Sequence, residues 1–246
     1  MRLLVSVSTA AEASAAVAGG ANIIDAKNPH AGALGAVSLE VLREIYSAVG
    51  GTRPVTAALG DAIDDSDLER DACAFAAAGA RYVKVGFAGI TSPARVAALI
   101  AAAVRGAMLG SDGAASLVAV AYADADRVDA VPADAFVTLA ARAGARGVLL
   151  DTADKSGPGL RGLMPPEVLA RWVAEAHQAG VFVALAGKLT ADDLTFVRDA
   201  GADIAGVRGA ACEGGRTGRI STKKVTLLRT LCDADQPASA DFSVSI

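Results

Sequence analysis

The chain has few cysteines, few aromatic residues and no excess of positive charge. Its three cysteines, Cys73, Cys212 and Cys232, are widely spaced and form no Cys-x-x-Cys pair. A disulfide-stabilised fold and a zinc cluster are therefore poorly supported, and no metal site is expected. Aromatic residues make up only 4% of the chain, so the core must consist mainly of small aliphatic side chains. The net charge is −4 without a basic block, which argues against a broad nucleic-acid-binding surface.

Long apolar runs are also missing. No apolar stretch reaches the ~18 residues, free of glycine and charge, that a membrane span requires. The alanine-rich stretch 96–109 is interrupted by Arg105 and Gly106 and is typical of a buried helix. The first residues lack the apolar segment and cleavage site of a signal peptide. The sequence therefore predicts a reduced, cytoplasmic, soluble protein that does not contact membranes.

One pattern does recur along the chain. An alanine-rich stretch ends in Ala-Gly and is followed closely by an apolar, β-branched run, at 18–25, 78–85, 143–151, 179–186 and 200–207. Glycine is the expected residue just past a helix, because it tolerates the left-handed backbone conformation. Further apolar runs at 3–6, 55–58 and 117–121 bring the predicted strands to eight. Their nearly continuous apolar character favours a parallel sheet covered by helices.

Helical patterns separate these strands, at 10–18, 39–48, 65–78, 93–109, 132–143, 165–179, 191–200 and 223–232. Eight strand–helix units in 246 residues predict an α/β fold with a single (β/α)8 TIM barrel, residues 1–232. A doubly wound open sheet is the alternative, but the even repetition and the lack of an early Gly-x-Gly-x-x-Gly count against it. The small, polar residues 233–246 are predicted to form a flexible or subunit-docking tail.

Acidic and basic residues interrupt three of the apolar strands near their ends. Asp25 and Lys27 are two residues apart and therefore project from the same face of a strand. Lys84 lies in a second such strand, whereas Asp151 ends a later one and is followed by Lys155. Each residue alone is often a cap or a salt bridge. Together, however, they would meet at the C-terminal mouth of a barrel, where such enzymes carry their chemistry.

Crowded, partly buried lysines disfavour one another's charge. A pKa lowered by ~3 units would leave one amine neutral near pH 7. A neutral amine can attack a carbonyl to form a Schiff base, and neighbouring Asp and Lys groups can then move protons. This pattern predicts carbon–carbon bond formation or elimination on an aldehyde or ketone. Asp61, Tyr122 and Asp124 lie at the same strand ends and are predicted to support the reacting groups.

A second set of residues follows the last two strands of the predicted barrel, where TIM barrels often bind phosphate. Gly187 and Gly209 allow close backbone approach to an anion, and Lys188 and Arg208 add positive charge. Asn28, next to Lys27, completes the predicted substrate-binding and phosphate-binding set.

Several segments resemble the (5-formylfuran-3-yl)methyl phosphate synthase family. They are Gly20-Ala-Asn-Ile-Ile-Asp-Ala-Lys-Asn-Pro, Tyr82-Val-Lys-Val-Gly, Ala121-Tyr-Ala-Asp, Asp151-Thr-Ala-Asp-Lys, Ala184-Leu-Ala-Gly and Gly206-Val-Arg-Gly-Ala-Ala-Cys-Glu-Gly-Gly. They occur in order from the first strand to about residue 219. The Asp-x-Lys-Asn-Pro and Val-Arg-Gly-Ala-x-Cys-Glu-Gly-Gly segments are specific to this family rather than general barrel signals.

The resemblance implies a lyase that condenses two molecules of glyceraldehyde 3-phosphate, with loss of one phosphate and two waters, on the way to a methanofuran-type or methylofuran-type cofactor. It implies Lys27 as the Schiff-base lysine, with Asp25, Lys84, Asp151 and Lys155 in proton transfer and electrostatics. No cofactor is implied. The partners expected are a phosphorylated triose and, through alanine-rich helices, further copies of the chain.

Two other functions remain open from the sequence. A simpler class I aldolase or sugar-phosphate isomerase would release no phosphate. A non-catalytic barrel that binds phosphometabolites would hold the triose phosphate without forming an adduct. The cluster of lysines speaks against the second option, because one lysine suffices to bind a phosphate.

Overall fold

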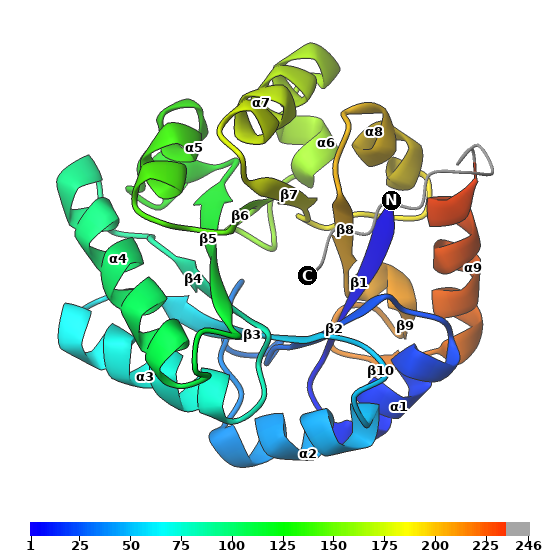
Figure 1. Cartoon of the computed structure of the whole chain (residues 1–246). Helices are drawn as coiled ribbons and strands as arrows, with labels where there is room; N and C mark the ends of the chain where they lie inside the picture. The colour runs from blue at the N-terminus through cyan, green and yellow to red at the C-terminus, as the bar shows by residue number, and fades with distance from the viewer. Residues whose placement is uncertain (235–246) are drawn as a thin grey trace.

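The computed structural model describes residues 1–234 and contains eight parallel strands that close into a barrel. Figure 1 looks along the barrel, with the helices forming an outer ring around the strands. Each strand pairs with the next along the chain, and the last pairs with the first. The predicted (β/α)8 barrel is confirmed, and the alternative of an open sheet is wrong. The predicted tail falls almost wholly outside the described residues.

The strands of the barrel are β1 (Arg2–Val7), β2 (Ile23–Ala26), β3 (Val55–Asp61), β4 (Tyr82–Gly86), β5 (Ser116–Tyr122), β6 (Gly147–Asp151), β7 (Phe182–Leu185) and β8 (Ile204–Val207). The α-helices are α1 (Ala10–Ala18), α2 (Leu39–Val49), α3 (Asp65–Ala77), α4 (Pro93–Leu109), α5 (Ala133–Arg142), α6 (Leu160–Leu163), α7 (Pro166–Gln178), α8 (Asp193–Asp199) and α9 (Thr222–Asp233). Two 3-10 turns, η1 (Ala125–Arg127) and η2 (Gly209–Ala211), and a hairpin of β9 (Cys212–Glu213) and β10 (Arg219–Ile220) complete the described elements.

The recurring Ala-Gly steps lie where helices give way to strands. Gly20, Gly79, Gly144, Gly180 and Gly201 all adopt positive φ, between 78° and 104°. A residue with a Cβ atom adopts this conformation only with strain, so glycine is required to turn each chain segment from helix toward the barrel. The predicted role of these glycines is confirmed.

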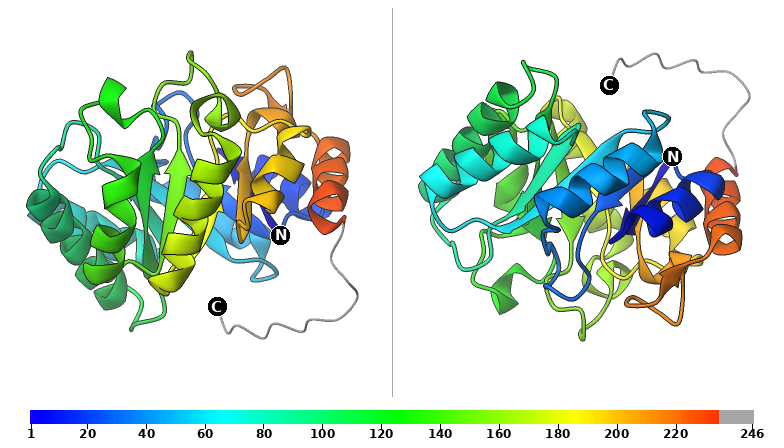
Figure 2. Two further views of the ribbon diagram at one scale, coloured as in Figure 1. Left: turned by 90° about the horizontal axis from the view of Figure 1, so that it is seen from above. Right: turned by 90° about the horizontal axis from the view of Figure 1, so that it is seen from below.

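Five short elements were not predicted, among them the 3-10 turns η1 and η2 with three residues each. The helix α6 has four residues, and the strands β9 and β10 have two residues each. Such short elements contain too few residues for an apolar period to be visible in the sequence. The hairpin matters for the site because it follows β8 after the short turn η2 and, as Figure 2 shows, lies at the end of the barrel opposite the N-terminus.

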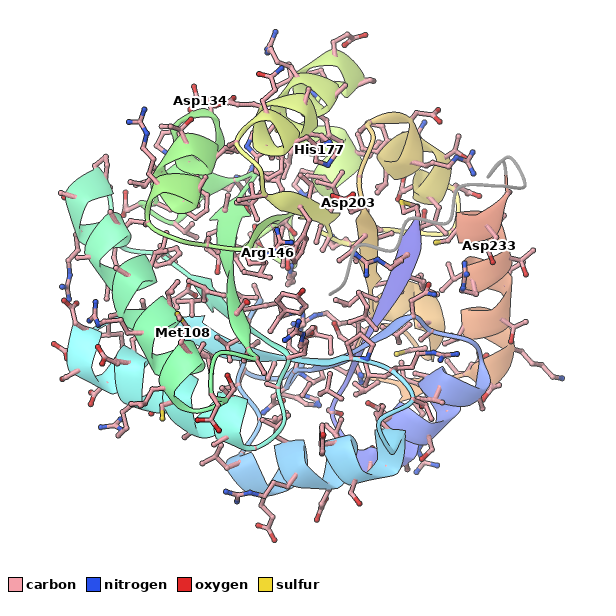
Figure 3. The ribbon with its side chains drawn as sticks, in the orientation of Figure 1. Met108, Asp134, Arg146, His177, Asp203 and Asp233 are labelled. Carbon is pink, nitrogen blue, oxygen red and sulfur yellow. The ribbon has the colours of Figure 1, made fainter. Side chains whose placement is uncertain are left out.

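The two ends of the barrel differ in chemistry. Apolar residues such as Leu4, Val118 and Leu149 line the lumen, whereas buried Asp and Lys side chains gather where the strands end. At the other end, His177 of α7 lies beside Asp203, which precedes β8 (Figure 3), with Nε2 2.9 Å from Oδ2. This places His177 away from the strand ends that carry the buried charges.

No helix among residues 1–234 is long and apolar enough to cross a membrane.

Candidate active site

Five predicted site residues come from three strands and meet at the C-terminal mouth of the barrel. Asp25 belongs to β2 and Lys27 follows that strand directly, Lys84 lies in β4, and Asp151 ends β6, four residues before Lys155. All five line one cavity of about 300 Å³. The parallel strands bring these distant residues together because their C-terminal ends open on the same face.

Asp25 is the centre of a fully buried polar cluster. Its Oδ1 is 2.6 Å from Lys84 Nζ and accepts a hydrogen bond from Thr56 Oγ1 at 2.7 Å. Its Oδ2 accepts a hydrogen bond from Ser6 Oγ at 2.8 Å. Burial alone would raise the pKa of Asp25, but Lys84, Lys27 and these hydrogen bonds hold the pKa below its ordinary value. Four adjacent strands therefore fix an ionised carboxylate on this wall of the cavity.

Asp151 pairs with a lysine from its own loop. Lys155 Nζ donates to Asp151 Oδ1 at 2.7 Å and also to the carbonyl oxygen of Thr152 at 2.5 Å. The Thr152 backbone N–H donates to the same carboxylate oxygen at 2.8 Å. Burial opposes ionisation, but Lys155 and Lys27 hold the pKa of Asp151 below its ordinary value. This second ionised carboxylate faces the cavity from the opposite side of the barrel.

Lys27 differs from the other two lysines because its ammonium forms no hydrogen bond or ion pair among the described residues. Its side chain is buried and lines the cavity. Loss of solvent lowers the pKa of Lys27 to about 8; Lys84 and Lys155 add to the lowering, whereas Asp151 and Asp25 oppose it. At pH 7 roughly a tenth of the molecules would hold this amine in its neutral form.

The three predicted supporting residues do not line the cavity, and Asp61 is exposed to solvent. Tyr122 donates its hydroxyl to Asp61 Oδ1 at 2.7 Å, and burial beside Asp61 raises the pKa of the phenol. Asp124 accepts hydrogen bonds from the backbone N–H groups of Ala153 and Asp154, at 2.7 and 2.8 Å. These bonds hold the start of the loop that carries Lys155.

The structure brings some of the predicted phosphate-binding residues to the cavity but not all of them. Gly187, Lys188 and Gly209 line the cavity, and none of their backbone N–H groups is bonded within residues 1–234. The Lys188 ammonium donates to the carbonyl oxygen of Gly157 at 2.5 Å. Asn28 does not line the cavity; its Oδ1 accepts a hydrogen bond from the His30 backbone N–H at 3.0 Å. This placement gives Asn28 a role in shaping the loop after Lys27.

Arg208 lines the cavity, but all five of its N–H groups already have partners. Two bonds go to Glu12 Oε2 and Oε1, at 2.7 and 3.1 Å, and one to the carbonyl oxygen of Ser6 at 3.0 Å. The other two go to the carbonyl oxygens of Arg216 and Gly218, at 2.9 and 3.1 Å. Since a guanidinium has five donors, none is left for a substrate phosphate. The placement therefore makes Arg208 a bridge between α1 and the loop after β8.

Sequence reasoning missed three residues of the site. Ser6 and Thr56 are the hydroxyl partners of Asp25, and Arg216 lines the cavity from the β9–β10 connection. A hydroxyl within an apolar strand was the available signal for the first two. Their pairing with Asp25 depends on the register of β1 and β3 against β2, which places all three at one level.

Within residues 1–234, no three His, Cys, Asp or Glu side chains are placed to hold a metal ion. A closed parallel barrel whose C-terminal mouth gathers three lysines and two aspartates around a cavity defines a TIM-barrel enzyme.

Comparisons with known proteins give the particular family. Residues 3–229 match the model of 4-HFC-P synthase. The (5-formylfuran-3-yl)methyl phosphate synthase of Methanocaldococcus jannaschii is 39% identical, over 94% of this chain and 100% of that protein. The enzyme of the same name from Methanopyrus kandleri is 40% identical, over 95% of this chain and 98% of that protein. The chain belongs to the (5-formylfuran-3-yl)methyl phosphate synthase family.

Solved structures support the fold at lower sequence identity. A 3-hexulose-6-phosphate synthase superposes with a TM-score of 0.65 at 20% identity, covering 94% of this chain and 99% of that one. A structure of KGPDC from Streptococcus mutans gives a TM-score of 0.66 at 14% identity, covering 94% and 97%. These similarities concern the barrel architecture alone.

Proposed function

We propose that this chain condenses two molecules of glyceraldehyde 3-phosphate to (5-formylfuran-3-yl)methyl phosphate, with release of one phosphate and two waters. The reaction belongs to the carbon–oxygen lyases that act on phosphates. The observation that carries the proposal is the amine of Lys27, which is buried at the cavity, has no ion pair among residues 1–234 and has a pKa of about 8. An amine of this kind is a nucleophile for an aldehyde near neutral pH.

The first step is attack of the neutral Lys27 Nζ on the aldehyde carbon of one triose phosphate. Loss of one water then gives an imine between the substrate carbon and Nζ. The protonated imine acidifies the neighbouring C2, and loss of the C2 proton and of the C3 phosphate leaves a conjugated iminium. C2 of the second triose phosphate gives up its proton and adds to that C3. Ring closure with loss of two waters forms the furan, and hydrolysis of the imine releases the aldehyde and returns the amine of Lys27. Asp151 is the charged group that acts most strongly on Lys27, so its carboxylate stabilises the positive charge of the iminium.

The two ion pairs have different parts in this scheme. Asp25 and Lys84 are fixed by strands and set the electrostatic field around Lys27. Asp151 and Lys155 sit at a strand end and its loop, where Lys155 can approach the substrate and exchange protons with it. Lys84 also lines the cavity and helps to keep the nearby amine neutral.

The product of this reaction would enter the synthesis of a furan cofactor of the methanofuran or methylofuran type, in the cytoplasm and without a cofactor of its own. We also propose that the protein is a homo-oligomer. Large apolar side chains are exposed on the helices and on the loop after β3, among them Ile63 at 89%, Leu109 at 72% and Leu227 at 57%. Light scattering on the purified protein would measure the subunit number.

Borohydride trapping tests the nucleophile. The purified protein is incubated with glyceraldehyde 3-phosphate and reduced, and the modified peptide is identified by mass spectrometry. Free phosphate and the absorbance of a furan aldehyde are followed in parallel. The proposal predicts an adduct on Lys27, with both products formed and all three signals lost in Lys27→Met. The control Lys223→Met changes an exposed lysine of α9 and should keep every signal.

Other outcomes identify the alternatives. A carbon–carbon product without released phosphate would indicate an ordinary class I aldolase. An isomerised triose phosphate without an adduct would indicate an isomerase. Binding of the triose phosphate without adduct or turnover would indicate a non-catalytic binding protein and contradict the proposal.

A further inference from the structure

The connection between β9 and β10 carries an arginine over the mouth of the barrel. Arg216 follows Gly214 and Gly215, whose φ angles of 81° and 80° require glycine. The hairpin lies at the catalytic end of the barrel (Figure 2). The Arg216 side chain lines the same cavity as Lys27 and Lys155.

The contacts of Arg216 leave part of its guanidinium free. Nη1 donates to the carbonyl oxygen of Pro29, and Nη2 donates to that of Gly32 at 2.6 Å. These two bonds occupy two of the five N–H groups of the side chain, and no other bond or ion pair involves it among residues 1–234. Both acceptors belong to the loop that follows Lys27, so Arg216 is held in place while three donors remain.

Arg208 provides the contrast within the same loop. Its charge is neutralised by Glu12, and two of its bonds hold the carbonyl oxygens of Arg216 and Gly218. Arg208 thereby fixes the backbone from which the Arg216 side chain extends. All donors of Arg208 are bonded within the protein, whereas Arg216 lines the cavity with three N–H groups unbonded among residues 1–234.

The surroundings of Arg216 favour an anion. Loss of solvent and the neighbouring Arg208 lower the pKa of its guanidinium, whereas Asp151 opposes this. Asp151 is engaged by Lys155, so Arg216 keeps a positive charge without a carboxylate partner among residues 1–234. The unpaired backbone N–H groups of Gly187 and Gly209 line the same cavity. A phosphate would satisfy donors from the guanidinium and from the backbone at once.

We propose that Arg216 binds the phosphate group of the triose phosphate whose aldehyde reacts with Lys27. The two bonds to the Pro29 and Gly32 carbonyl oxygens keep the planar fork oriented, and the remaining N–H groups hold the phosphate oxygens. A lysine could carry the charge but could not keep both loop contacts and a bidentate phosphate contact. This inference rests on the proposed function, which supplies the substrate.

The test compares Arg216→Gln and Arg216→Lys with Arg219→Gln. Arg219 is an exposed residue of β10 that does not line the cavity, and its substitution changes the charge of the same hairpin by the same amount. Binding of inorganic phosphate is measured by calorimetry. Borohydride trapping on Lys27 is measured against the concentration of glyceraldehyde 3-phosphate and of glyceraldehyde, which has the aldehyde but no phosphate. Circular dichroism verifies that each variant is folded.

The expected result is a phosphate dissociation constant and a half-saturating triose phosphate concentration raised about 10–100-fold in Arg216→Gln. The loss should be smaller in Arg216→Lys and absent in Arg219→Gln, and trapping with glyceraldehyde should be unchanged in all three. Equal phosphate binding in Arg216→Gln and Arg219→Gln would overturn the inference. An equal loss with glyceraldehyde would also overturn it, because Arg216 would then act only as a link between loops. If wild-type protein forms no adduct, the proposed function fails while phosphate calorimetry still decides the role of Arg216.

Discussion

The two buried aspartates of the cavity are held in different ways. Asp25 is bonded to residues of β1, β3 and β4, and the side chain of its partner Lys84 is only 4% exposed. Asp151 is bonded within its own strand end and loop, and the side chain of its partner Lys155 is 18% exposed. On one wall of the cavity, the barrel therefore holds a rigid ion pair between neighbouring strands. On the other wall, the ion pair is held only by one strand end and the loop that follows it. In the proposed reaction, the rigid pair tunes Lys27 and the loop pair moves protons.

The largest expected difference concerns stability. Asp25→Asn leaves Lys84 buried without its counter-charge, and breaking a buried pair in this way costs about 3–5 kcal/mol. In Asp151→Asn, Lys155 can turn toward solvent, so a loss of about 1–2 kcal/mol is expected for the hydrogen bonds alone. Urea unfolding of the two variants measures both values. Equal losses would mean that the two pairs are equally rigid, and the contrast between a strand-fixed pair and a loop pair would be wrong.

The second difference concerns turnover. Lys155→Met removes the proposed proton carrier and should lower kcat by about 100-fold or more, as is usual for general acid–base groups. The free energy of unfolding should fall by about 1–2 kcal/mol for the lost hydrogen bond, less than in Asp25→Asn, because Asp151 keeps its bond from the Thr152 N–H and its proximity to Lys27. Steady-state kinetics and urea unfolding are measured on the same preparation. A variant that unfolds readily but turns over normally would reverse the assigned roles.

The third difference concerns pH. Protonated Lys27 is not a nucleophile, so kcat/KM should rise with pH and level off above a pKa of about 8. The charge of Lys84 lowers the pKa of Lys27. When Lys84 is removed, Asp25 loses its partner and raises the pKa of Lys27 more strongly. Lys84→Met should therefore move the rise to higher pH. Lys155→Met should move it less, because Lys155 contributes the smaller repulsion. Unmoved profiles in both variants would show that neither lysine tunes Lys27.

The smallest expected effect comes from a hydroxyl. Thr56→Val removes one hydrogen bond to Asp25 and should cost about 1 kcal/mol of stability. The remaining bonds from Ser6 and Lys84 should keep Asp25 ionised, so the pH profile should stay in place. Ser6→Ala is the matched variant on the other carboxylate oxygen. A large shift of the profile in either variant would indicate that the rigid cluster depends on a single hydroxyl.

Much of the fold could be predicted because its signals are local. The Ala-Gly steps mark the ends of helices, and the apolar runs that follow them mark strands of a buried parallel sheet. Once the barrel is inferred, the position of Asp25, Lys27, Lys84 and Asp151 at one mouth follows from strand direction alone. The sequence could not show Ser6 and Thr56 as partners of Asp25, because strand register is a tertiary property.

The two arginines of the loop after β8 illustrate the same limit. Nothing local distinguishes Arg208 from Arg216, and the more obvious candidate for phosphate was Arg208. The difference arises largely from Glu12, which lies 196 residues away in the sequence and neutralises the guanidinium of Arg208. Whether a charged side chain is available to a ligand depends on such distant partners.

Direct titration of Lys27 is the most decisive measurement. Protein labelled with ¹³C at the lysine ε-carbon is followed by NMR between pH 6 and 11, and Lys27→Met assigns the signal. A midpoint near pH 8, well below those of the exposed lysines, is the expected result. A midpoint near 10.5 would mean that Lys27 is an ordinary ammonium near neutral pH, and the proposed nucleophile would be contradicted.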